Sequence, residues 1–375
     1  MLGRLRRHLA DELLHTIRRF HTSCGMFHCR DHASRQVILM LLTIFVITTG
    51  CSNPTPTNND TRGTPEVTDV TMRLQWLPQF QFAGYLVAEA RGYYRDAGLN
   101  VTILPGGPDA VPLPLVATGA NTFGSTGADT ILISRAQGIE VVALATWFQV
   151  SPVAFMVHRD SGIRSPQDFV GRRVAMFYGD NVETEYRALL AATGVDPTSI
   201  NEIPGDYSIA PFLERRADVW PVYATDQPYT ARAAGADIEL IVARDYGVEL
   251  MGDVLFTTAE FARKNPNTVR AFVQATLRGW QDAITDPAAA VNIILARNPD
   301  FDRGHLEFEA TETIKLLRYG IGARCVGASD QQAWAKEAEL LRSLGVLKTA
   351  VDPATVLVTD AVDDYYRARG IECQR

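Results

Sequence analysis

Residues 74–85 read LQWLPQFQFAGY, and this stretch joins a predicted strand to a predicted helix. Residues 71–76 alternate as a strand does, and Pro78 ends that strand because proline has no N–H to donate. Apolar side chains then recur at helical spacing over residues 82–98. The loop 76–81 carries an indole and two carboxamides but no charge. Ligands of open α/β sheets bind beyond the carboxyl ends of strands, so we expect this loop to hold a flat, neutral molecule with polar edges.

The same alternation of strand and helix continues along the chain. Further strands are predicted at residues 100–104, 122–124, 141–146, 154–157, 173–177, 217–222, 240–243 and 253–257. Helices are predicted at residues 113–118, 131–137, 183–192, 209–215, 227–234 and 267–285. The order predicts an α/β fold of two Rossmann-like lobes, joined by two hinge crossings near Ser151 and Gly252, with a ligand cleft between the lobes.

The first 51 residues have the features of an export signal. Residues 1–36 are rich in arginine, and the apolar run 37–48 is shorter than the roughly 20 residues that span a bilayer. Small residues and Cys51 follow, as in a lipoprotein signal, so Cys51 is the expected lipid anchor. We therefore divide the chain into a signal peptide (1–50), a flexible tether (51–70), the first part of lobe 1 (71–151), lobe 2 (152–252), and a return to lobe 1 with C-terminal helices (253–375).

Charge and residue counts narrow the function. The chain has a formal net charge of −7, and removal of the basic signal would make it more acidic, which argues against a nucleic-acid partner. Cys325 and Cys373 follow the predicted anchor and could form one disulfide or remain as two thiols. His158 and His305 are the only histidines after Cys51, and no metal-ligand spacing is present. The sequence indicates no metal and no cofactor.

Aromatic, hydroxyl and amide side chains recur where the predicted strands end. Ser125 and Thr126 occupy a position at which they could cap a helix, contact a ligand, or do both. Of the five aromatic candidates we expect two or three in the cleft, because each alone is more often a core residue. The candidate ligand-binding residues are Gln75, Trp76, Gln79, Tyr85, Ser125, Thr126, Trp147, Gln149, Asp180, Asn181, Tyr223, Asp226, Gln227, Tyr246 and Asp253.

Several motifs resemble those of one family of solute-binding proteins. They are QWLPQ at 75–79, FAGY at 82–85, GYYRDAGL at 92–99, the glycine pair at 106–107, and TDQP at 225–228. The chain resembles solute-binding proteins of ABC importers, in the branch related to thiamine-pyrimidine synthase, over residues 71–344. The resemblance implies a type II periplasmic-binding-protein fold and delivery of a ligand to a membrane permease and its ATPase. Members of this group bind formylaminopyrimidine, riboflavin, alkanesulfonates, taurine or nitrate.

Two departures from the family pattern bear on function. The synthase has a cysteine-rich iron-binding cluster, whereas Cys325 and Cys373 stand alone, which argues against synthesis. Pyrimidine-binding relatives carry Asn-Glu-Pro where this chain has Asp-Gln-Pro at 226–228. The candidate loops contain no lysine or arginine, so an uncharged ligand is favoured over an anion.

The hydrogen-bonding groups on the ring edge distinguish riboflavin from formylaminopyrimidine. Carboxamides suit the dione edge of an isoalloxazine, whereas an aminopyrimidine prefers a carboxylate. We therefore expect riboflavin, with Asp180, Asn181 and Glu183 near its ribityl tail, and keep formylaminopyrimidine as the alternative. An exported enzyme acting on a pyrimidine-like substrate is the alternative of another class, although neither histidine falls in a candidate loop.

Overall fold

The computed structural model describes residues 63–205 and 208–373, so the predicted signal peptide, Cys51 and most of the tether lie outside the described residues. Five strands form sheet A, in the spatial order β2-β1-β3-β10-β4. Strands β1, β2 and β3 run parallel, and β10 pairs antiparallel with both β3 and β4. The strands of sheet A are β1 (Asp69–Arg73), β2 (Asn100–Leu104), β3 (Phe123–Gly127), β4 (Val141–Thr146) and β10 (Asp253–Thr258).

The second sheet, sheet B, repeats this arrangement in the order β7-β6-β8-β5-β9. Here β6 runs parallel to β7 and β8, and β5 pairs antiparallel with β8 and β9. Each sheet therefore has three adjacent parallel strands, an antiparallel strand beside them, and an edge strand that pairs antiparallel with that fourth strand. The strands of sheet B are β5 (Val153–His158), β6 (Arg173–Met176), β7 (Asn201–Pro204), β8 (Val219–Tyr223) and β9 (Ile238–Ile241).

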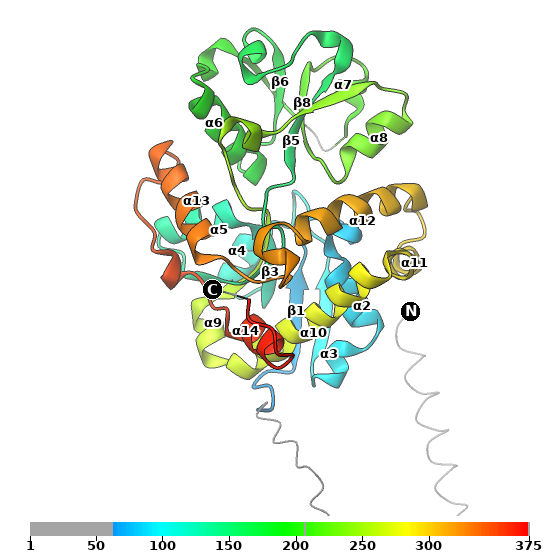
Figure 1. The fold of residues 1–375 in the computed structure, drawn as a ribbon, viewed down its shortest axis with the longest axis vertical. Coiled ribbons are helices and arrows are strands. Elements are labelled where there is room, and N and C mark those ends of the chain that lie inside the picture. The colour runs from blue at the N-terminus through cyan, green and yellow to red at the C-terminus, as the bar shows by residue number, and fades with distance from the viewer. Residues whose placement is uncertain (1–62, 206–207, 374–375) are drawn as a thin grey trace, which may run out of the picture. The chain divides into compact units, whose positions relative to one another are not determined.

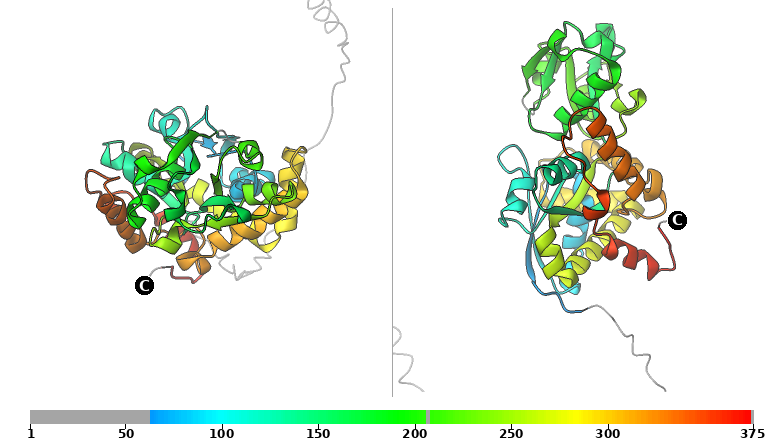
Figure 2. Two further views of the ribbon diagram at one scale, coloured as in Figure 1. Left: turned by 90° about the horizontal axis from the view of Figure 1, so that it is seen from above. Right: turned by 90° about the vertical axis from the view of Figure 1, so that its left-hand side faces the viewer.

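The helices divide between the two sheets. Figure 1 shows the green segment that carries α6, α7 and α8 around sheet B, while the yellow-to-red C-terminal helices accompany the blue and cyan segments of sheet A. The right-hand view of Figure 2 shows the same division. The α-helices are α2 (Ala83–Ala90), α3 (Tyr93–Asp96), α4 (Pro112–Ala117), α5 (Ala128–Ala136), α6 (Asn181–Thr193), α7 (Ala210–Leu213), α8 (Gln227–Ala233), α9 (Ala259–Lys264), α10 (Pro266–Thr285), α11 (Pro287–Arg297), α12 (Arg303–Leu317), α13 (Gln331–Ser343) and α14 (Asp360–Arg367).

Short 3-10 helices complete the described chain. They are η2 (Phe80–Phe82), η3 (Arg159–Ser161), η4 (Pro166–Phe169), η5 (Pro197–Ser199), η6 (Ala243–Tyr246), η7 (Gly320–Ala323) and η8 (Pro353–Thr355). Across residues 63–205 and 208–373, no helix combines the length and apolar character needed to cross a membrane.

The close contact of α2 with α10 explains the glycine of the FAGY motif. A Cβ at Gly84 would lie 2.4 Å from the Trp280 ring, and a Cβ at Gly279 would lie 1.9 Å from the Gly84 carbonyl oxygen. Neither distance is sterically possible, so glycine at both positions lets the two helices meet. Tyr85 and Phe272 pack in the same buried cluster. This contact fixes α2, and therefore the loop that precedes it, onto the core.

Several predicted elements are confirmed and others are corrected. The strands at 100–104 and 141–146 have the predicted bounds, and β10 returns to the first sheet as expected. The predicted helix over 82–98 is wrong as a single element, because Gly92 has φ 76° and separates α2 from α3. Strand β1 ends at Arg73, three residues before the predicted end, and β7 was not predicted.

The capping role suggested for Ser125 and Thr126 is also wrong. Both residues lie inside β3, where Ser125 pairs with Leu255 and Thr126 with Val254 of β10. Helix α5 begins only after Gly127. Pairing with a strand far along the chain has extended β3 beyond its predicted end.

The two cysteines of the described region form a disulfide. Cys325 follows η7, Cys373 lies beyond α14, and their Cα atoms are 5.6 Å apart. The sequence is compatible with a disulfide and with two free thiols, and the structure shows the disulfide. The bond ties the C-terminal segment to the core cluster that contains the fully buried Cys325.

Buried carboxyl groups contact both chain crossings between the sheets. Glu185 of α6 accepts a hydrogen bond from the Ser151 hydroxyl in the first crossing. Glu337 of α13 accepts one from the Met251 N–H in the second crossing, at 2.7 Å. Burial raises the pKa of Glu185 to about 8, with Asp129 adding to the increase and the Arg244 guanidinium opposing it. Burial also raises the pKa of Glu337 well above its usual value. The crossings are therefore held by carboxyl groups that favour the protonated form.

This raised pKa gives a testable pH dependence of stability. Because the folded pKa of Glu185 lies above its usual value of 4.5, its contribution is fully present below about pH 4.5 and is lost as pH rises through about 8. We expect Glu185→Gln, which keeps an acceptor for Ser151, to lose less thermal stability than the wild type between pH 5 and pH 9, by several degrees. Thermal unfolding at both pH values measures the difference, and parallel curves for the two proteins would contradict it.

Candidate ligand site

A cavity of about 320 Å³ lies where strands of both sheets end, and its size falls within the usual range of ligand pockets. Sheet A contributes the loops after β1 and β2 and the end of β3. Sheet B contributes the loop after β6 and the end of β8. The lining residues are Gln75, Trp76, Gln81, Gly107, Pro108, Val111, Pro112, Thr126, Thr130, Phe177, Tyr178, Gly179, Asp180, Asn181, Val182, Trp220, Pro221, Val222, Tyr223, Asp226 and Gln227.

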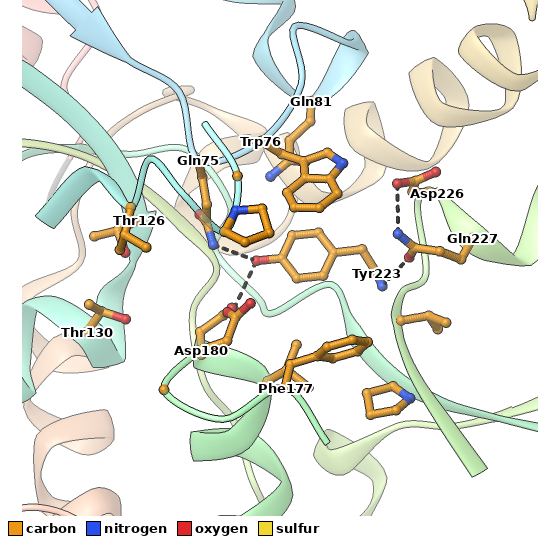
Figure 3. Close-up of a pocket in the computed structure, with 18 of the residues that line it drawn as sticks. Gln75, Trp76, Gln81, Thr126, Thr130, Phe177, Asp180, Tyr223, Asp226 and Gln227 are labelled. Carbon is orange, nitrogen blue, oxygen red and sulfur yellow. Dashed lines mark hydrogen bonds between the residues drawn. The ribbon is translucent and has the colours of Figure 1, made fainter. Parts of the chain in front are cut away.

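The Tyr223 hydroxyl is the hydrogen-bonding centre of this cavity (Figure 3). It accepts hydrogen bonds from Gln75 Nε2 at 3.3 Å and from Asn181 Nδ2 at 2.9 Å, so residues from both sheets meet on it. A hydroxyl that accepts twice still has its own proton to donate. Within the described chain, the buried atoms Gln75 Oε1 and Asn181 Oδ1 have no hydrogen-bond partner. The cavity therefore offers a hydroxyl donor beside amide acceptors.

Aromatic rings make up much of the cavity wall. Figure 3 shows the Tyr223 ring between Trp76 and Phe177. Trp220 of β8 and Tyr178 after β6 add two further rings, and 57% of Tyr178 is exposed. Such rings offer apolar faces to a flat ligand, while the amides and the hydroxyl can form hydrogen bonds with its polar edge.

The loop between β1 and α2 is fixed from behind by two buried carboxyl groups. Glu309 of α12 accepts hydrogen bonds from the N–H groups of Phe80 and Gln81, both at 2.9 Å. The Gln81 amide, which lines the cavity, donates to Asp253 at 2.7 Å. Burial raises the pKa of Glu309 to about 8 and that of Asp253 to about 7. These contacts set the position of Trp76 and its neighbours.

The electrostatic character of the cavity is neutral to acidic. None of its described lining residues is a lysine or an arginine, and Asp180 and Asp226 are its two carboxyl groups. Burial raises the pKa of Asp180. Asp226 accepts a hydrogen bond from Gln227 Nε2 at 2.9 Å, and Gln227 Oε1 accepts one from the Tyr223 N–H at 2.8 Å. The arrangement suits an uncharged ligand better than an anion.

The structure brings together about half of the candidates identified in the sequence. Gln79 lies just outside the first cavity and lines a second one beside it. Asp253 reaches the first cavity only through Gln81. The candidates that line the first cavity are Gln75, Trp76, Thr126, Asp180, Asn181, Tyr223, Asp226 and Gln227.

The other candidates lie away from the cavity. Trp147 donates its indole N–H to the Tyr85 hydroxyl at 2.6 Å, and both rings are buried in the core. Ser125 is fully buried within β3. Gln149 donates to the carbonyl oxygens of Thr146 and Ala328 instead of facing the cavity. Tyr246 packs on a different cluster of buried residues. For Trp147 and Gln149, a position just after a strand was therefore not sufficient to reach the cavity.

Sequence reasoning missed several residues of the site. Phe177 and Tyr178 follow β6 directly. The strand-end rule, by which residues just after a strand are expected at the ligand site, selected Asp180 and applies to these two residues as well. Trp220 lies inside β8, where no local signal marks it. His305 and Glu309 are four residues apart on α12 and line the second cavity, although His305 lies outside every candidate loop of the sequence. Their spacing marks one helix face, but nothing in the sequence connects that face with the loop.

Comparison with known proteins identifies the family. A family model described as NMT1/THI5 like matches residues 79–290, which is more than half of the chain. The chain belongs to the NMT1/THI5-like family. This NMT1/THI5-like chain is 28% identical over 336 residues to the riboflavin-binding protein RibY of Chloroflexus aurantiacus, covering 84% of this chain and 95% of that protein. It is 24% identical over 290 residues to the formylaminopyrimidine-binding protein of Halalkalibacterium halodurans, covering 76% and 85%.

The family also contains enzymes. The NMT1/THI5-like chain is 25% identical over 235 residues to 4-amino-5-hydroxymethyl-2-methylpyrimidine phosphate synthase of Legionella pneumophila, covering 61% of this chain and 74% of that protein. Family membership alone therefore leaves binding and catalysis both open.

A solved structure establishes the fold. The alkanesulfonate-binding protein SsuA of Xanthomonas axonopodis pv. citri, bound to MOPS, superposes on the NMT1/THI5-like chain with a TM-score of 0.60 at 16% identity, covering 78% of this chain and 99% of that one. The two sheets with two crossings are thus a type II periplasmic-binding-protein fold, as the sequence predicted. At this identity the likeness concerns the fold alone.

Proposed function

We propose that this chain is the extracytoplasmic solute-binding component of an ABC importer and that it captures riboflavin for a membrane permease. The composition of the first cavity is the observation that carries the proposal: rings and amides surround it, and no lysine or arginine is among its described lining residues. The relative named as a riboflavin-binding protein supports this choice of ligand.

The hydrogen-bonding groups fit the edge of an isoalloxazine ring. Its imide N–H would donate to the amide oxygen of Gln75 or Asn181, neither of which has a partner among the described residues. A neighbouring carbonyl of the ligand would accept a hydrogen bond from the Tyr223 hydroxyl. The ring itself would lie against Trp76 and the other aromatic side chains. In this function the two lobes close on the ligand and present the closed form to the permease and its ATPase.

Formylaminopyrimidine is the second candidate ligand. The Asp226 carboxylate lines the first cavity and could accept from the amino group of a pyrimidine, and one relative is named as a formylaminopyrimidine-binding protein. Binding without turnover is favoured over synthesis, because Cys325 and Cys373 are joined to each other and neither lines the cavity. The Cys51 lipid anchor and the export signal remain proposals from the sequence.

A ligand titration tests the proposed function. The purified protein, refolded to remove bound ligand, is titrated with riboflavin, formylaminopyrimidine and taurine while tryptophan fluorescence is followed. We expect saturable quenching by riboflavin and none by taurine, which carries an anionic sulfonate group, and chromatography should recover riboflavin unchanged. Saturation only by formylaminopyrimidine would identify that compound, and not riboflavin, as the ligand. Saturation by taurine would contradict a site that excludes anionic groups, and conversion of any ligand would contradict pure binding.

A further inference from the structure

A second cavity of about 370 Å³ lies beside the first and shares part of its wall. Trp76, Asp226 and Gln227 line both cavities. Beyond this shared wall, α12 and the two residues before it contribute half of the lining, and Thr230 is the one lining residue from α8. The remaining lining residues are Leu77, Gln79, Ser208 and Ile209. A ligand lying against Trp76 and Gln227 in the first cavity is therefore next to the second.

Polar side chains in this second cavity are held by one another. Asp226, only 9% exposed, accepts from Gln79 Nε2 at 3.3 Å, and its other oxygen lies 2.7 Å from His305 Nε2. The Tyr229 ring stacks on His305 with centroids 5.0 Å apart, and the Tyr229 hydroxyl donates to Asp302 at 2.9 Å. The imidazole is thereby fixed beside the carboxylate, and the cavity presents donors and acceptors in a defined arrangement.

The charges in this cavity select between neutral and anionic groups. Asp226, Asp302 and Glu309 are the carboxyl groups of this cavity, Asp226 lies against the His305 imidazole, and the described lining residues include no lysine or arginine. Burial alone would lower the pKa of His305, but the contact with Asp226 raises it above its usual value, so its charge is paired. Hydroxyl groups can donate to the carboxylates, whereas a phosphate would be repelled by them.

We propose that the second cavity is a subsite for the hydroxylated side chain of the ligand and that it rejects the phosphorylated form of that ligand. This inference rests on the proposed function, in which the ring occupies the first cavity. It replaces the sequence-based expectation that the tail lies near Asp180, Asn181 and Glu183, of which only Glu183 lies outside the first cavity. That side chain lines neither cavity, accepts a hydrogen bond from the Gly179 N–H and pairs with Arg187.

Variants at Thr230 test the subsite without altering the first cavity. Thr230 is an exposed residue of α8 that lines only the second cavity. Affinities for riboflavin, lumiflavin, which lacks the ribityl chain, and flavin mononucleotide are measured by equilibrium dialysis. We expect the wild type to bind riboflavin about tenfold or more tightly than the mononucleotide. We expect Thr230→Phe, which places a ring in the second cavity, to weaken riboflavin binding about tenfold while leaving lumiflavin binding unchanged.

Two further variants complete the test. Thr230→Lys adds a cation and should reduce the difference in affinity between riboflavin and flavin mononucleotide. Ala233→Phe, at an exposed position of the same helix that lines neither cavity, should change nothing. Equal effects of Thr230→Phe on riboflavin and lumiflavin, or equal wild-type affinities for riboflavin and its phosphate, would overturn the subsite alone. Failure of the wild type to bind either riboflavin or lumiflavin would overturn the proposed function and the subsite with it.

Discussion

Replacing Trp76 with alanine is expected to weaken riboflavin binding by roughly 10- to 100-fold, since stacking of a flat ring on an aromatic side chain contributes about 1–3 kcal/mol. Trp76 lines both cavities, so its removal also takes away part of the wall between them. The side chain is only partly buried, and the variant should remain folded. Equilibrium dialysis is the suitable measurement, because the substitution removes a tryptophan that would otherwise report binding.

Two controls separate stacking from general disturbance. Trp76→Phe keeps a smaller ring and should recover much of the affinity. Tyr319→Ala removes an aromatic side chain that is 48% exposed and lines neither described cavity, so it should bind as the wild type does. Unchanged affinity in Trp76→Ala, with the wild type binding riboflavin, would show that the ligand does not use this ring.

Local sequence patterns located most strands, and they failed where a distant partner sets the structure. The strand at 141–146 is a continuous apolar run that is fully buried, so its pattern was sufficient. Strand β7 contains Asn and Pro, which are uncommon in strands, and it forms because it can pair with β6. Ser125 and Thr126 suit a helix cap or a strand equally well. Pairing with β10, some 130 residues later, decides between the two.

The strand-end rule explains both the success and the failure of the site prediction. Residues at or after the ends of β1, β2, β3, β6 and β8 reach the cavity, and all five belong to the parallel strands on one side of β10 or of β5. Trp147 follows β4, which lies at the opposite edge of sheet A, beyond β10. Its side chain turns into the core. Local patterns indicate where strands end but not their order in the sheet, and the order determines which ends share a cavity.

Contacts supplied by α12 lay beyond what the sequence could indicate. Glu309 lies more than 220 residues from the loop that it holds. A glutamate on a helix face is normally read as a solvated residue, yet this one is only 1% exposed. Its function follows from the two backbone N–H groups of the loop, which need an acceptor once they are buried.

Replacing Glu309 with alanine is expected to destabilise the protein and to weaken ligand binding together. The N–H groups of Phe80 and Gln81 would lose their acceptor, at a cost of about 1–3 kcal/mol for each buried group. We expect a decrease of several degrees or more in the melting temperature. Because the same loop carries Trp76 and the Gln81 amide, riboflavin affinity should decrease even at temperatures where the variant is folded. Thermal unfolding and equilibrium dialysis measure the two effects.

Comparison within α12 makes this prediction specific. Glu307→Ala is the matched control, because Glu307 is exposed on the same helix and its contact with Arg303, at 3.7 Å, is a surface ion pair of little energetic value. Glu309→Gln should be intermediate, since its amide keeps one acceptor oxygen but turns an NH₂ group toward the second N–H. Equal stability of the Glu309→Ala and Glu307→Ala proteins would mean that the loop is held by other contacts. A loss of stability with unchanged affinity would separate the fold of this loop from its part in binding.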